Sequence, residues 1–163
     1  HSNVWYAEKE DESFFKNLTE YIEKGISPKK KVKKKWSTDP EKKVKVEKSA
    51  IAKTISYYEG LGYEIESVEK ENMGWDLTAM LEKRILRLEV KGLSQSEICV
   101  QMTPNEYAKM KEHKDTYRIC VVTDALKKPK LDIFYYSQDS GEWENDNGNI
   151  LKIEEIMAAK LSC

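Results

Sequence analysis

The chain has 163 residues, of which 35% are charged, and its formal net charge at pH 7 is −1. This length suits one domain with a moderate core and an additional segment. Because the overall charge is near neutral, a nucleic-acid site would require local clustering of basic residues. No apolar run reaches membrane-spanning length and no signal peptide is visible, so we expect an intracellular protein of the cytoplasm or nucleus, with no membrane partner.

The cysteines and histidines exclude several kinds of chemistry. Cys99, Cys120 and Cys163 have neither CxxC spacing nor an even count, which argues against a zinc knuckle or a disulfide framework. His1 and His113 are the only histidines in the sequence, so a serine or cysteine hydrolase with a histidine base is not expected. The sequence has no phosphate-binding glycine loop.

Residues 1–36 are expected to form an N-terminal helix followed by a basic linker. Within residues 3–26, the apolar spacing i, i+3, i+4, i+7 predicts an amphipathic helix, carried by Phe14, Phe15, Leu18, Tyr21 and Ile22. Residues 28–36, called the basic arm below, hold Lys29, Lys30, Lys31, Lys33, Lys34, Lys35 and Trp36. One interpretation is an arm that contacts nucleic-acid phosphates while Trp36 stacks on a base. A solvated linker and a nuclear-localisation tract are the alternatives.

Residues 37–163 are expected to form the second domain, which begins with a helix. Asp39 followed by Pro40 is typical of a helix start, and the helix should run to about Glu59. Its predicted apolar stripe comprises Glu47, Ala50, Ile51, Thr54, Ile55 and Tyr58. Because Glu47 lies on or beside this stripe, its carboxylate needs a partner. That partner is either Lys43 or Lys48, or else Glu47 is a third acid of a functional site.

Residues 75–81 and 85–92 alternate between apolar and polar side chains, which predicts a β-hairpin. A register in which paired residue numbers sum to 165 places Leu77 opposite Leu88 and buries the apolar side chains on one face. The same register places Asp76 opposite Glu89. At an effective dielectric of 20, two carboxylates about 5 Å apart repel by roughly 3 kcal/mol. Either the hairpin face is solvated and screened by neighbouring cations, or the acids form a Mg²⁺ site.

The remaining predicted elements complete an α/β fold with a mixed central sheet flanked by helices. Strands are expected at residues 63–68, 98–102, 117–123 and 131–136. Thr103 and Glu106 form a predicted capping box that starts a helix reaching about Lys114. A last helix is expected at residues 152–160. The predicted order is α-β-β-β-(β)-α-β-β-α.

Several short motifs together resemble a known family. Asp76 followed by Glu89-Val90-Lys91 resembles the PD-(D/E)xK nuclease superfamily, although Gly74-Trp75 replaces the proline for which the superfamily is named. With Val46-Glu47-x-x-Ala50 and Thr103-Pro104-Asn105-Glu106, residues 44–126 resemble the protein NO VEIN C-terminal domain family, a branch of unknown function. The resemblance implies a restriction-endonuclease-like core (α-β-β-β-α-β) with an added N-terminal helix and a C-terminal strand and helix.

The resemblance also implies roles for particular side chains. Asp76 and Glu89 would be ligands of Mg²⁺, or of Mn²⁺, together with the carbonyl of Val90. Lys91 would lie beside the scissile phosphate. Glu47 corresponds to an acid that many superfamily members carry on the first helix, where it acts through a metal-bound water.

Further candidates for the polar site are Gln101 and Tyr107, whereas the start of the helix explains Thr103 and Glu106. The function expected from the resemblance is a Mg²⁺-dependent endonuclease acting on DNA or RNA, at the C-terminal end of a larger defence or repair protein. Homodimerisation is compatible with this expectation. The alternative is a catalytically inactive module of the same fold that binds nucleic acid or protein.

Overall fold

The computed structural model describes residues 39–156. The predicted N-terminal helix, the basic arm and the end of the predicted last helix lie outside these residues. The described part contains α2 (Pro40–Gly60), β1 (Glu64–Ser67), the short 3₁₀ turn η1 (Glu69–Glu71), β2 (Leu77–Leu81), β3 (Arg84–Gly92), α3 (Pro104–Glu112), β4 (Tyr117–Thr123), β5 (Lys130–Tyr136) and β6 (Trp143–Glu144). Neither helix between residues 39 and 156 combines the length and apolarity needed to cross a bilayer.

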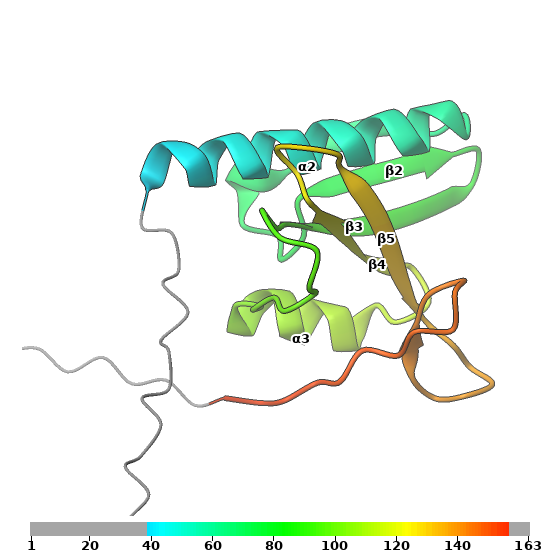
Figure 1. The fold of residues 1–163 in the computed structure, drawn as a ribbon. Coiled ribbons are helices and arrows are strands. Elements are labelled where there is room, and N and C mark those ends of the chain that lie inside the picture. Colours follow the sequence, from blue (N-terminus) through cyan, green and yellow to red (C-terminus); the bar gives the residue numbers. More distant parts are fainter. Residues whose placement is uncertain (1–38, 157–163) are drawn as a thin grey trace, which may run out of the picture. The chain divides into compact units, whose positions relative to one another are not determined.

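Within residues 39–156 the strands form one six-stranded sheet in the order β1-β2-β3-β4-β5-β6. Neighbouring strands are antiparallel except for β3 and β4, which are parallel. A parallel pair requires a crossover connection, and residues 93–116, including α3, provide it. Helix α2 runs along one face of the sheet and α3 lies on the opposite face (Figure 1). The predicted mixed α/β fold, with its α-β-β-β-α-β core order, is therefore confirmed.

Helix α2 begins and ends as its sequence predicts. The Asp39 side chain accepts hydrogen bonds from the backbone N–H groups of Glu41 and Lys42, at 3.0 and 3.3 Å. The buried row comprises Val46, Ala50, Thr54 and Tyr58, an i, i+4 pattern that faces the sheet. Its centre is one position away from the predicted stripe, because Val46 rather than Glu47 is buried.

Gly92, at the end of β3, allows α2 to lie close to the sheet. A Cβ atom at this position would come within 2.8 Å of Val46 Cγ1 and 2.9 Å of the Val46 carbonyl oxygen. Because one of these atoms belongs to the helix backbone, a rotamer change could not relieve the clash. The glycine therefore determines how closely α2 packs on β3.

The β2–β3 hairpin has the predicted register. Leu77 pairs with Leu88, Ala79 with Leu86 and Leu81 with Arg84. The apolar side chains of this hairpin join Tyr58, Tyr63 and Cys120 in a core cluster. A second cluster lies on the α3 face of the sheet and contains Met110, Tyr117, Ile119, Val121, Phe134 and Trp143. The two faces of the sheet are thus covered by different helices.

Two predicted elements are corrected by the structure. Residues 98–102 do not form a strand, and β3 is already paired on both sides, with β2 and β4. The apolar side chains of this segment, Ile98, Val100 and Met102, instead pack against the second core cluster.

Residues 152–156 do not form the first half of a helix. The Leu151 N–H donates to the Trp143 carbonyl at 2.8 Å, and Glu155 accepts a hydrogen bond from the Tyr107 hydroxyl at 2.8 Å. These contacts hold the segment beside β6 and α3 in a non-helical conformation. The two-residue strand β6 was not predicted.

Candidate functional site

The alternation of β3 directs Glu89 and Lys91 toward the α3 face of the sheet. Glu89 is 1% exposed, and its Oε1 lies 2.6 Å from the Lys91 ammonium. The same ammonium lies 2.7 Å from Glu106 Oε2, in the first turn of α3. One lysine therefore bridges a carboxylate of the sheet and a carboxylate of the helix. We call Asp76, Glu89, Lys91 and Glu106 the Lys91 cluster.

Asp76 lies immediately before β2, where the ladder between β2 and β3 ends at the Leu77–Leu88 pair. Its carboxylate Oδ2 accepts a hydrogen bond from the Val90 N–H at 2.7 Å. Its backbone N–H donates to the Leu88 carbonyl at 3.0 Å. The side chain of Asp76 thus binds β3 at the residue between Glu89 and Lys91.

Burial and like charges raise the pKa values of two acids in this cluster. Burial and the nearby Asp76 raise the pKa of Glu89 to about 8, although Lys91 opposes the change. Burial also raises the pKa of Asp76, against the hydrogen bond from Val90 and the charge of Lys91. Burial alone would lower the pKa of Lys91, but Glu89 and Glu106 outweigh it and keep the lysine charged. The Lys91 cluster therefore holds three carboxyl groups and one ammonium, an excess of acid that a proton or a cation can balance.

Sequence reasoning missed Tyr117, which joins two parts of the site. Its hydroxyl donates to the Gly74 carbonyl at 2.8 Å and lies 3.4 Å from Glu89 Oε2. Tyr117 is fully buried, as expected for the first residue of an apolar strand. Nothing in its sequence context separates this tyrosine from an ordinary core residue.

The donor atoms near β3 fit a hard divalent cation. The carboxylates of Asp76 and Glu89 supply oxygens, and the Val90 carbonyl, which the superfamily resemblance adds, belongs to the residue whose N–H donates to Asp76. Mg²⁺ commonly binds one or two carboxylates and retains several waters. Between residues 39 and 156 no three His, Cys, Asp or Glu side chains form a group that could hold a metal. A cation here would thus depend on two carboxylates, one carbonyl and water.

Two predicted site residues, Glu47 and Tyr107, make their contacts outside the Lys91 cluster. Glu47 has a 56% exposed side chain and pairs with Lys43 at 3.7 Å, which is the salt-bridge alternative rather than a third acid. Gln101 is exposed on the segment before α3. The Tyr107 hydroxyl donates to Glu155 instead of reaching the cluster. The lysines of the basic arm and Trp36 lie outside the described residues.

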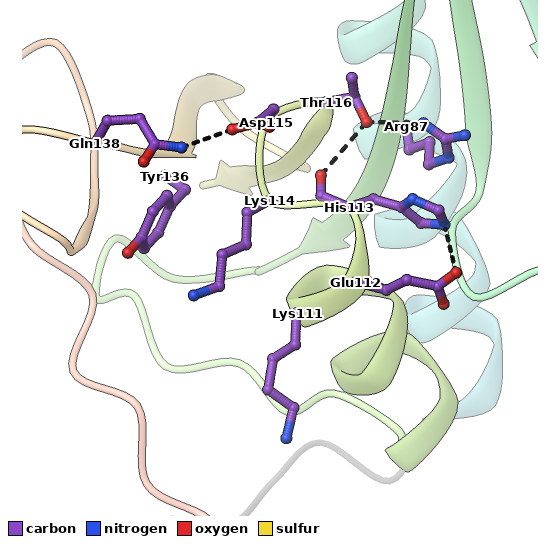
Figure 2. A pocket seen from close by; sticks show the side chains of 9 residues that line it. All are labelled: Arg87, Lys111, Glu112, His113, Lys114, Asp115, Thr116, Tyr136 and Gln138. Atoms are coloured by element: carbon purple, nitrogen blue, oxygen red, sulfur yellow. Dashed lines mark hydrogen bonds and ion pairs between the residues drawn. The ribbon is translucent and has the colours of Figure 1, made fainter.

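A separate cavity of about 570 Å³ lies at the C-terminal end of α3 (Figure 2). The Arg87 guanidinium donates to Thr116 Oγ1 at 2.7 Å and lies 5.1 Å from the Trp75 ring centroid. Its buried Nε has no hydrogen-bond partner among the described residues. The lining mixes cations with Glu112 and Asp115, so its charge does not favour one class of ligand.

Comparisons with known proteins identify the family. Neither the curated proteins nor the solved structures include a match to this chain. The family model described as "Protein NO VEIN, C-terminal" matches residues 46–135, which is more than half of the chain and includes every member of the Lys91 cluster. The chain therefore belongs to the NO VEIN C-terminal family.

Proposed function

We propose that this domain is a Mg²⁺-dependent phosphodiesterase that cleaves DNA. The observation that carries the proposal is the position of the Lys91 ammonium, between Glu89 and Glu106, with Asp76 bound to the N–H of the intervening Val90. The D…ExK pattern of these residues, which resembles the PD-(D/E)xK nucleases, supports the same chemistry.

Three members of the Lys91 cluster, Asp76, Glu89 and Lys91, have roles in this proposal, together with Val90 and Tyr117. Asp76, Glu89 and the Val90 carbonyl would hold the cation, which supplies Lewis acidity and lowers the pKa of a bound water. Lys91 would donate to a non-bridging phosphate oxygen and stabilise the charge that develops on it. Tyr117 would orient Glu89 and, through the Gly74 carbonyl, the segment that precedes Asp76.

The proposed substrate is double-stranded or single-stranded DNA, with RNA as a further candidate, and Mn²⁺ could replace Mg²⁺. Lys29 to Lys35 and Trp36 of the basic arm would contact the nucleic-acid backbone. We further propose that the domain is the effector part of a larger intracellular defence or repair protein, in the cytoplasm or nucleus, and that it can act as a homodimer.

A cleavage assay with the complete 163-residue chain tests this function. Plasmid and linear DNA are incubated with the folded protein in Mg²⁺, in Mn²⁺ or in a chelator. Cleavage should require a divalent cation and fall at least about 100-fold in Asp76→Asn and Lys91→Ala, because each removes a group that acts on the transition state. Glu112→Gln, which changes an exposed acid of α3, should retain activity. A folded, metal-replete protein that leaves DNA intact would exclude the proposed DNA nuclease.

The second candidate function is nucleic-acid binding without cleavage, which the lysine density of the basic arm favours. Binding would then weaken steeply with salt and persist in Asp76→Asn. Deleting residues 1–36 should abolish it. Binding that is unchanged when the arm lysines are replaced by glutamine would eliminate this candidate and leave a protein-interaction domain as the alternative.

A further inference from the structure

We infer that Glu106 is a positioning residue that holds Lys91 in place for the reaction, in addition to capping α3. This inference rests on the proposed function. The start of the helix accounts fully for Glu106 at the level of sequence, so its contact with β3 is a feature that only the structure reveals.

A single oxygen of Glu106 connects the helix cap to Lys91. Oε2 accepts a hydrogen bond from the Thr103 N–H at 2.9 Å and another from the Lys91 ammonium at 2.7 Å. The capping bond fixes the glutamate side chain against the first turn of α3, so the carboxylate is already oriented for the lysine. The side chains of Lys91 and Glu106 are each 19% exposed, which limits competition from water.

Glu106 matters as a second partner of Lys91 because Glu89 would have to bind both Lys91 and the proposed cation. Lys91 lies 2.6 Å from Glu89 Oε1, and the proposed cation would bind the same carboxylate. If Glu89 were its only partner, the lysine would compete with the cation or move away from the site. With Glu106 as an alternative partner, Lys91 stays beside the site when Glu89 binds the cation. A lysine has three donors, so one remains for a phosphate oxygen.

The capping box offers a matched pair of variants. Glutamine also functions at the third helical position of a capping box, so Glu106→Gln keeps the acceptor for the Thr103 N–H and removes only the charge that holds Lys91. Thr103→Ala does the opposite, because it removes the hydroxyl that caps Glu106 N–H and leaves the carboxylate. Loss of the cap and loss of the ion pair can thus be separated.

Amine labelling of the complete chain measures the contact without requiring catalysis. The protein is treated with acetic anhydride, and modification of Lys91 is followed by peptide mass spectrometry, with the exposed Lys45 and Lys53 as internal references. Lys91 should be modified several-fold faster in Glu106→Gln than in the wild type or Thr103→Ala. Equal rates at Lys91 in wild type and Glu106→Gln would overturn the inference.

Steady-state cleavage kinetics then measure how loss of the contact between Glu106 and Lys91 affects catalysis. Glu106→Gln should lower kcat by about tenfold or more, the loss expected for one charge-assisted hydrogen bond, and leave KM for DNA within about twofold. Thr103→Ala should remain within a few-fold of wild type. Wild-type kcat in Glu106→Gln would overturn the positioning role. Absence of cleavage by the wild type would instead refute the proposed function, while the labelling result would still report whether Glu106 holds Lys91.

Discussion

Replacing Glu89 with glutamine should remove a pH dependence from the stability of the domain. Glu89 is 1% exposed, and burial together with the charge of Asp76 raises its pKa from 4.5 to about 8. Between these two values the folded protein retains a proton that the unfolded chain has released. Glutamine has nearly the same shape and no charge to lose.

The sign and size of the effect follow from proton linkage. Because the unfolded state binds fewer protons in this window, the free energy of unfolding falls as pH rises from about 4.5 to about 8. The slope is at most about 1.4 kcal/mol per pH unit, and the whole window corresponds to about 5 kcal/mol as an upper limit. Below pH 4.5 both states are protonated and above pH 8 both are ionised, so the contribution of Glu89 to the slope vanishes there.

Urea unfolding at pH 5, 6, 7 and 8, in a chelator that removes divalent cations, measures this slope. The wild type should lose stability relative to Glu89→Gln as pH rises, so the variant should become the more stable protein at pH 8. Glu64→Gln, which removes an exposed carboxyl on β1, should keep the wild-type slope. Parallel stability profiles for wild type and Glu89→Gln would refute the assignment of a retained proton to Glu89.

Three further outcomes are expected. Tyr117→Phe should destabilise the domain by about 1–3 kcal/mol in urea unfolding, because the buried Gly74 carbonyl loses its donor; an unchanged unfolding midpoint would contradict that hydrogen bond. Gly92→Ala should cost about 1–3 kcal/mol in the same assay, since the new Cβ would press on the α2 backbone, whereas Gly60→Ala, with open space around it and no positive φ, provides a comparison without the clash. At ten times its Kd, Mg²⁺ should stabilise the wild type by about 1.4 kcal/mol and raise its melting temperature, with no rise in Asp76→Asn; equal shifts in both proteins would place the ion elsewhere.

The elements that sequence reasoning recovered are those with strong local signals. Asp39-Pro40 and the capping box of Thr103 and Glu106 define the starts of the two helices, and strict alternation fixes the β2–β3 register. The alternation of apolar and polar residues wrongly predicted a strand at residues 98–102. A period of two indicates which side chains face the core, but it does not show that a neighbouring strand pairs with the segment. The predicted helix at residues 152–156 failed because contacts with Trp143 and Tyr107 outweigh local helix propensity.

The site was recoverable only where its residues follow one another along β3. Glu89, Val90 and Lys91 form a recognisable triplet, and the hairpin register brings Asp76 near them. Glu106 comes from α3, so its distance from Lys91 depends on how the crossover packs, which no local pattern encodes. Glu47 illustrates the opposite case: a rotation of α2 by one position places it in solvent beside Lys43.

The outer strands of the sheet limit how another chain could join it. β1 is only four residues long and carries the exposed Glu64 and Glu66. At the opposite side β6 has two residues, and the returning chain bridges Glu144 to Ile150. Short, charged or covered edges disfavour intermolecular strand addition. A macromolecule that binds the described domain should therefore contact its side chains rather than add a strand to the sheet.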